Sequence, residues 1–368
     1  MSLFIFIALS VWAGLNSYVF WRLGSLPVIA GFLPKWAIWT LAVACWSSLP
    51  VSRWLSGFPD LSAGIEVFAM TWLGILFLLF VSLLAVDIVS LNGIFLSAYV
   101  VRLRMAAAVL ALVFGAIAIF QGNRAPVVNA QEVVLPGLPK ERDGLKILFI
   151  SDLHLGGQIG GAWLHALVGR ISALAPDLIA IGGDVVDHDI SRVRDMVPAL
   201  STLRAPLGVW AVLGNHDFYG GADEAAEIMQ AAGFHVLRDE SAVPLSGLRI
   251  AGVDDLGVRA HSGSVEPALR SALTLVRSEK EGCVLLSHTP IGADEAAKAG
   301  AGLMLCGHTH GGQIWPFNFL VQLRYPELVG GFKHGAMTLF ISRGAGTWGP
   351  RMRLWKPGEV VLITLRAP

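Results

Sequence analysis

The sequence predicts an all-α region of about four membrane-spanning helices, followed by a layered α/β domain. Three observations lead to this prediction. The 368 residues are 54% hydrophobic and only 15% charged, which is too apolar for an ordinary soluble enzyme. Charged side chains make up about 7% of residues 1–126 but about 19% of the remainder, which is a membrane-to-soluble transition. Beyond residue 126, short β-rich segments alternate with helix-like ones.

The first region contains long apolar runs. Residues 68–86 carry no charge and, at about 1.5 Å per residue, are long enough to cross a hydrocarbon core of about 30 Å. Residues 3–20 and 105–120 are similar in character, and 36–51 is a shorter fourth run. We therefore expect a transmembrane helical region at 1–122 with about four helices, three or five being the alternatives.

The run at 3–20 is interpreted as a membrane helix and not as a secretory signal. No basic residue precedes it, no convincing small-residue cleavage site follows Ser17, and further apolar runs come after it. Four basic side chains lie in the first and third loops, against two in the second loop and after the last helix. If basic loops stay in the cytoplasm, the α/β domain faces the extracytoplasmic side of the membrane.

The second region begins with residues 123–144, which are rich in Pro and Gly and are expected to form a linker with a candidate first edge strand. The domain itself spans 145–368. Its expected strands are 146–151, 178–181, 209–213, 249–253, 284–287, 302–306, 339–342 and 360–365. Its expected helices include 163–174, 222–232, 267–277 and 294–299. This alternation predicts an α/β domain with its helices outside the sheets.

Five of these strands run directly into Asp, Asn or His side chains. The blocks are Asp152-Leu153-His154, Gly183-Asp184, Gly214-Asn215-His216-Asp217, His288 and His308-Thr309-His310. Because open α/β sheets bind ligands at the carboxyl edge, we expect these side chains to meet there. Carboxylate, imidazole and amide ligands suit divalent Mn, Fe or Zn. A cluster of this many groups exceeds what one ion needs, which predicts two ions about 3.5–4 Å apart.

Taken in this order, the blocks resemble those of the calcineurin-like metallophosphoesterase superfamily, over residues 145–365. The strings SDLHLG at 151–156, GNHD at 214–217, GHTHGGQ at 307–313 and SRGAG at 342–346 resemble its bacterial membrane-associated or exported phosphodiesterase branch. The resemblance implies a four-layer α/β/β/α metallophosphoesterase sandwich and a metal-dependent phosphoester hydrolase with a binuclear metal centre.

The resemblance also implies a role for each matched residue. The first metal is held by Asp152, His154 and His310. The second is held by Asn215, His288 and His308, with Asp184 bridging the two. His216 does not bind metal but acts as general acid to the leaving oxygen, and Asp217 orients its imidazole. Such a metal pair lowers the pKa of a bound water towards about 7 and neutralises charge on the phosphoryl oxygens.

Several residues leave alternatives open. Asp187 either orients a neighbouring group or is a solvated turn residue. Val185 follows Asp184 where the phosphoprotein-phosphatase branch has an arginine, which favours diesters or pyrophosphates over phosphoserine; Arg343 or Arg351 is a candidate phosphate contact. One apolar group forms either a rim that accepts lipid or ordinary loop packing, namely Trp315, Phe317, Phe319, Leu320 and Trp348.

The favoured hypothesis is a membrane-anchored hydrolase of phosphodiester or pyrophosphate bonds, acting on a lipid-linked substrate. A formal net charge of zero gives no global attraction to nucleic acid. Three alternatives remain open. They are a pyrophosphatase of lipid A synthesis cleaving a UDP-diacylglucosamine-type substrate, a non-catalytic membrane sensor of a phosphoryl ligand, and a two-metal amidohydrolase.

Overall fold

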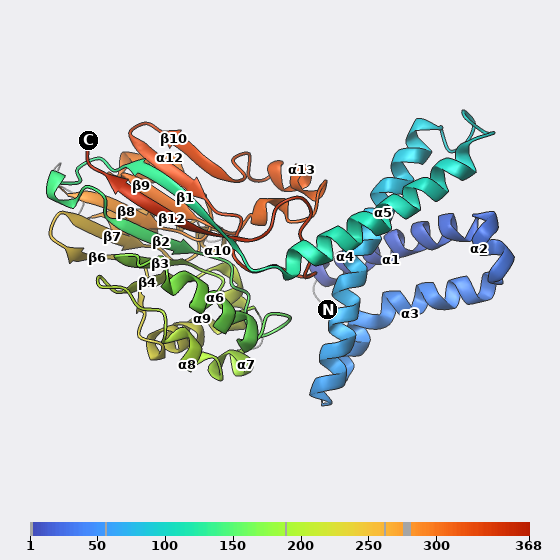
Figure 1. Ribbon diagram of the computed structural model, residues 1–368, viewed down its shortest axis with the longest axis horizontal. Helices are drawn as coiled ribbons and strands as arrows, with labels where there is room; N and C mark the ends of the chain where they lie inside the picture. Colours follow the sequence, from blue (N-terminus) through green and yellow to red (C-terminus); the bar gives the residue numbers. More distant parts are fainter. Residues whose placement is uncertain (1–2, 56, 188–189, 261–262, 275–280) are drawn as a thin grey trace. The chain divides into compact units, whose positions relative to one another are not determined.

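The computed structural model describes residues 3–55, 57–187, 190–260, 263–274 and 281–368 (Figure 1). The chain divides into two compact units. The helical unit comprises Met1–Asn123 together with Gly349–Trp355. The sheet unit comprises Arg124–Trp348 together with Lys356–Pro368. The grouping of Gly349–Trp355 with the helices is a feature that the sequence does not indicate.

The described part of the helical unit contains five helices, and each of the four apolar runs lies within one of them. They are α1 (Leu3–Gly24), α2 (Pro27–Phe32), α3 (Lys35–Trp54), α4 (Pro59–Val89) and α5 (Val100–Asn123). Two segments, Asp60–Val89 and Val100–Asn123, are long and apolar enough to cross a membrane. A count of four spanning helices stays a prediction.

The segment Gly349–Trp355 packs on α5. The backbone N–H of Arg353 donates to the carbonyl oxygen of Ala118 at 2.8 Å, and the Trp355 ring lies edge-on to Phe114. Gly122 permits this approach, because a Cβ atom there would lie 2.6 Å from the carbonyl oxygen of Arg351. A segment distant in sequence therefore becomes part of the helical unit.

The sheet unit contains two six-stranded sheets. The first has the order β1-β12-β2-β3-β4-β5, with bounds Val127–Val134, Glu359–Arg366, Lys146–Ile150, Leu178–Gly182, Val209–Val212 and His235–Val236. The second has the order β10-β11-β9-β8-β7-β6, with bounds Gly330–His334, Met337–Ile341, Leu303–Cys306, Gly282–Leu286, Leu248–Gly252 and Glu240–Leu245.

The helices of this unit, except α13, cover the outer faces of both sheets. They are α6 (Gly161–Ser172), α7 (Ile190–Arg194), α8 (Val197–Leu200), α9 (Asn215–Ala231), α10 (Leu256–Ala260), α11 (Val265–Leu273), α12 (Ala293–Lys298) and α13 (Phe317–Gln322), with 3₁₀ turns at Lys140–Arg142 and His310–Gly312. Figure 1 shows α6 to α9 gathered on one side of the first sheet.

The layers arise because successive residues of each central strand point to opposite faces of the sheet and enter different cores. Leu148 of β2 belongs to a core with Leu164 of α6, whereas its neighbour Phe149 belongs to a second core with Leu286 of β8. A third core joins the outer face of the second sheet to α11 and α12. Strands buried on both faces read as continuous apolar runs, which is why the sequence shows them clearly. The predicted four-layer α/β/β/α sandwich is confirmed.

The sequence missed some elements of this unit. β1 is not among them, because it lies in the linker that was expected to hold a first edge strand, and it pairs in parallel with β12. The short or half-exposed strands β5, β6 and β10 were not predicted, because they lack a continuous apolar run. α9 begins at Asn215 and not at 222, since the two glycines after Tyr219 read as a break; Gly221 is indeed non-helical. Residues 275–277 of the predicted helix 267–277 lie outside the described residues.

The register brings strand ends from both sheets to one edge. β2, β3 and β4 run in parallel, with Ile150 beside Ile181 and Gly182 beside Val212. In the second sheet β8 and β9 are also parallel to each other. The polar blocks follow these five strands.

Candidate metal centre

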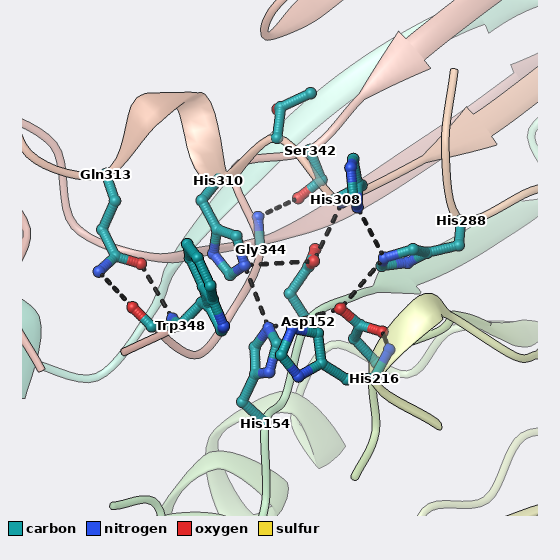
Figure 2. Close-up of polar contacts among 12 residues, drawn as sticks. Asp152, His154, His216, His288, His308, His310, Gln313, Ser342, Gly344 and Trp348 are labelled. Carbon is teal, nitrogen blue, oxygen red and sulfur yellow. Dashed lines mark hydrogen bonds and ion pairs between the residues drawn. The ribbon is translucent and has the colours of Figure 1, made fainter. Parts of the chain in front are cut away.

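The seven predicted metal ligands converge where these strands end, and Figure 2 shows most of their side chains facing one another. Asp152 and His154 follow β2, and Asp184 follows β3. The others follow β4, β8 and β9, namely Asn215, His288, His308 and His310.

The first group of donors is Asp152, His154 and His310. One ligand atom of each lies within 4.8 Å of the others, and all three residues are buried. The Nε2 atoms of His154 and His310 are 3.1 Å apart, and His310 Nε2 lies 3.5 Å from Asp152 Oδ1. This is the trio expected at the first metal.

The second group is Asn215, His288 and His308. His308 Nδ1 lies 3.0 Å from Asn215 Oδ1 and 3.3 Å from His288 Nε2. His288 Nδ1 lies 2.8 Å from the carbonyl oxygen of Gly182, which can only accept a hydrogen bond. The proton of this imidazole is therefore on Nδ1, and Nε2 is left as the ligand atom.

Asp184 lies between the two groups. Its Oδ2 atom is 3.6 Å from His154 Nε2 and 3.1 Å from His288 Nε2. Its other oxygen, Oδ1, accepts the backbone N–H of His216 at 2.8 Å. One carboxylate oxygen is thus within reach of donors from both groups, which is the geometry that a bridging ligand requires.

The chemistry of this donor set fits a pair of divalent cations. Asp152 Oδ2 is buried without a hydrogen-bond partner among the described residues. Ring nitrogens face each other in two places, at the His154–His310 and His288–His308 contacts. Such contacts between acceptors are repulsive unless a proton or a cation lies between them. Carboxylate, imidazole and amide donors together suit Mn, Fe or Zn.

The backbone around the donors adopts conformations that side chains rarely take. The φ angles of five ligands lie between 47° and 70°, those of Asp152, His154, Asp184, His308 and His310. Non-glycine residues in this region are strained and gather at functional sites. Gly214 allows the closest approach, because a Cβ atom there would lie 2.2 Å from Asp184 Oδ1. The loops therefore contain strained backbone conformations that orient the ligand side chains towards one another.

Comparison with known proteins agrees with this geometry. The family model for calcineurin-like phosphoesterases matches residues 145–312. An uncharacterized metallophosphoesterase from Aquifex aeolicus is 35% identical over 236 residues, which cover 62% of this chain and 87% of that protein. The chain belongs to the calcineurin-like phosphoesterases. Members of this family usually bind a dinuclear metal centre and hydrolyse phosphoesters.

Two further relatives of this phosphoesterase match a similar part of the chain. An uncharacterized metallophosphoesterase from Campylobacter jejuni is 32% identical, and the match covers 66% of this chain and 64% of that protein. A protein from Danio rerio named transmembrane protein with metallophosphoesterase domain is 32% identical, and the match covers 70% of this chain and 62% of that protein. The phosphoesterase thus spans slightly less than two thirds of the length of these two relatives.

The expected partner of the His216 imidazole requires a correction. The carboxylate next to this ring belongs to Asp187, whose Oδ1 lies 2.9 Å from His216 Nδ1 and 3.5 Å from His154 Nδ1. Of the two readings that the sequence left open for Asp187, the structure favours the orienting one. The only signal was its position three residues after Asp184, and the spacing did not reveal which ring it would face.

Asp217 has a different role from the one expected. Its Oδ2 accepts the backbone N–H groups of Asp184 at 2.9 Å and Gly214 at 2.8 Å, and its Oδ1 accepts that of Val186 at 2.9 Å. Asp217 is the third residue of α9, and a carboxylate there naturally turns back to the start of its helix. It therefore fixes the loop that carries Asp184 and does not reach the His216 ring.

Burial and the charge of Asp184 shift the pKa values of both His216 and Asp217. Burial lowers the pKa of His216, but the hydrogen bond to Asp187 and the nearby charge of Asp184 raise it by more, so that it lies above its usual value. Burial and the Asp184 charge raise the pKa of Asp217 to about 6. The neighbouring carboxylates therefore favour the protonated form of the imidazole that faces the metal groups.

Other candidate residues lie in unexpected surroundings. The guanidinium of Arg343 donates to Glu359 Oε2 at 2.6 Å, and its backbone N–H donates to Oε1 of the same residue at 2.9 Å. Arg351 belongs to the helical unit. The sequence also missed Tyr325, whose hydroxyl lies 3.0 Å from His308 Nε2 and orients that ring. No spacing signal marks Tyr325, because it reaches the site only through the folding of a long loop.

Proposed function

We propose that the sheet unit hydrolyses phosphodiester or pyrophosphate bonds with two divalent metal ions, with His216 as general acid. The observation that carries this proposal is the position of Asp184 between two separate trios of donors. A single-metal site has no use for a second trio that shares a carboxylate with the first. The proposed ligands are the seven residues Asp152, His154, Asp184, Asn215, His288, His308 and His310.

The residues of the chain have distinct tasks in this reaction. When bound, the metal pair supplies a water of lowered pKa and neutralises charge on the phosphoryl group. Asp187 holds Nδ1 of His216, so that the opposite side of the ring can face the leaving oxygen. His216 then gives its proton to that oxygen as its bond to phosphorus breaks, and the oxygen of the attacking water takes its place on phosphorus.

The choice of substrate bond rests on what surrounds the metal groups. Val185 and Val186 follow the proposed bridging carboxylate and are fully buried, so no cation extends from these positions. Arg343, a candidate phosphate contact, forms an ion pair with the buried Glu359. A doubly charged phosphate monoester would receive no added cation from these residues. This favours the singly charged phosphate of a diester or pyrophosphate.

We further propose that the helical unit anchors the enzyme in a membrane, that the catalytic domain lies on the extracytoplasmic side, and that the substrate is lipid-linked. Two apolar helices of sufficient length and a relative named as a transmembrane protein support the anchor. A reporter of membrane topology fused after Pro368 tests the side. A cytoplasmic reporter would instead favour a UDP-diacylglucosamine-type pyrophosphatase.

The general-acid assignment is tested by His216→Ala. Turnover should fall by about 10²–10⁴-fold for diesters with poor leaving groups and much less for p-nitrophenyl esters, which do not need protonation. Elemental analysis should find the metal content near that of wild type. A parallel loss of metal would show that His216 is a ligand. Absence of turnover in the metal-loaded wild type, with a phosphoryl ligand still bound, would favour the non-catalytic sensor.

A further inference from the structure

The chain passes between the two units at three points, and each attaches to the metal-site edge of the sheet unit. α5 ends at Asn123 and β1 begins at Val127. Val127 pairs with Glu359, the first residue of β12. Because β12 is antiparallel to β2, the beginning of β12 lies at the edge where β2 ends and Asp152 follows. The connections at 123–127 and 355–359 therefore both reach that edge.

The third connection starts at Trp348, beside the metal centre. Its ring centroid lies 6.0 Å from that of His216 (Figure 2). Its backbone N–H donates to Gln313 Oε1 at 3.0 Å, and Gln313 Nε2 donates to its carbonyl oxygen at 2.9 Å. Gly349, the next residue, already belongs to the helical unit. All three connections thus leave the sheet unit at the metal edge and not at the opposite edge.

An exposed apolar surface lies along the same edge. We name it the apolar rim, and it consists of Trp315, Phe317, Phe319, Leu320, Leu323 and Trp348. Leu323 is 83% exposed and Phe319 is 58% exposed, and α13, which carries part of the rim, has no buried residue. Ordinary loop packing, the other reading of these side chains, would have covered them. Large apolar side chains exposed together at one edge mark a candidate interaction surface.

The rim is connected to the proposed ligands of the second metal. Tyr325 follows α13, and its backbone N–H donates to the carbonyl oxygen of Val321 at 2.9 Å. Its hydroxyl lies 3.0 Å from His308 Nε2, and the exposed Arg324 guanidinium lies over its ring. A cation thus follows the apolar rim directly in the chain and lies over the ring that contacts His308. This combination matches an interface with acyl chains on one side and phosphate on the other.

We propose that the apolar rim inserts into the bilayer interface and presents the metal centre to phosphoester bonds in lipid headgroups. The choice of substrate rests on the proposed phosphoester hydrolysis, whereas the insertion does not. Indole and phenyl side chains favour the interfacial layer, and the chain passes to the proposed anchor from this same edge of the sheet unit. A phosphodiester in a headgroup then meets the metals without leaving the membrane.

Insertion is tested with the full chain in lipid nanodiscs, in a Cys45→Ser background. Leu323→Cys is labelled with an environment-sensitive dye, and the lipids carry a nitroxide quencher near the headgroup. Val134→Cys is the matched control, because Val134 is also exposed but ends β1 at the opposite edge. The label at position 323 should be quenched at least twofold more than the label at 134. Equal quenching, or shielding that depends on protein concentration as in a second copy, would overturn the proposal.

The substrate class is tested by the double variant Phe319→Ser and Leu323→Ser. Two rates are compared, headgroup release from phosphatidylglycerol in the nanodisc and hydrolysis of a water-soluble p-nitrophenyl diester. The ratio of lipid rate to soluble rate should fall at least tenfold. An unchanged ratio would overturn the role of the rim in lipid access. If the metal-loaded wild type hydrolyses neither compound, the proposed function fails, while the quenching experiment still decides insertion.

Discussion

Two of the buried clusters of charged side chains among the described residues are built in opposite ways. In the helical unit, Asp87 receives Arg22 Nε at 2.6 Å, Arg104 Nε at 2.9 Å and the hydroxyl of Tyr18 at 2.6 Å. Arg22 also donates to Asn92. The carboxylate is surrounded by donors from α1 and α5, so its negative charge is paired with two cations of the protein itself.

The cluster at the sheet edge is not satisfied by its own side chains. Carboxylates and imidazoles face each other, with two nitrogen–nitrogen contacts and the buried Asp152 Oδ2 lacking a described hydrogen-bond partner. The comparison teaches that burial of charge alone does not identify a functional site. A carboxylate that is paired with cations of the protein joins elements together, whereas an excess of acceptors requires cations from outside.

The largest effect is expected from Asp184→Asn. An amide cannot share a negative oxygen between two cations, so both metal positions should weaken. Turnover should fall by about 10³-fold or more, because metal catalysis supplies several kcal/mol. Elemental analysis and steady-state kinetics measure the two effects. Full occupancy of both positions in this variant would show that Asp184 is not the bridge and would weaken the contrast between the clusters.

Asp87→Asn tests the cluster of the helical unit. The substitution leaves two buried guanidinium groups without their carboxylate, which should cost about 3–5 kcal/mol in the free energy of unfolding. Denaturation in mixed micelles measures the loss, with the exposed Asp60→Asn as control. Metal content should be unchanged. A variant as stable as Asp60→Asn would mean that the ion pairs of Asp87 do not hold the helices together.

Asp187→Asn and Asp217→Asn form a matched pair next to the metal groups. Loss of the Asp187 charge should lower turnover by about 10–100-fold, more for poor leaving groups, because His216 is no longer oriented and charged. Asp217→Asn should mainly lower the thermal stability, because it removes an acceptor from three backbone N–H groups. If only the Asp217 variant showed the leaving-group dependence, the original assignment from the sequence would be restored.

The smallest effect is expected at an exposed cluster, where His334 meets Asp294 at 2.6 Å and Glu327 at 3.1 Å. Hydrogen bonds to these carboxylates raise the pKa of His334 above its usual value. The stabilisation is therefore complete below the ordinary histidine pKa and is lost as pH rises through the raised one. His334→Gln should lower stability at pH 5.5 by at most about 1 kcal/mol, and not at pH 9. Urea titrations of both proteins measure this, and a difference independent of pH would contradict it.

Much of the sheet unit could be predicted from the sequence because its central strands are buried on both faces. The segments that form β2, β3, β4, β8 and β9 are each an apolar run that ends in a polar block. The order of these blocks indicated both the fold and the ligand set. The partner of His216 could not be predicted in the same way. Asp187 and Asp217 are both close to the site in sequence, and only the direction of the third residue of α9 separates their roles.

The sequence by itself determined which residues bear charge, which segments are apolar, and which side chains follow the strands, since these properties are local. Only the tertiary structure decided that Gly349–Trp355 packs on α5, that Tyr325 reaches His308, and that Arg343 pairs with Glu359. Each of these depends on loops that cross between elements far apart in the chain. Their paths are set by the packing of the whole unit, and no short-range pattern records them.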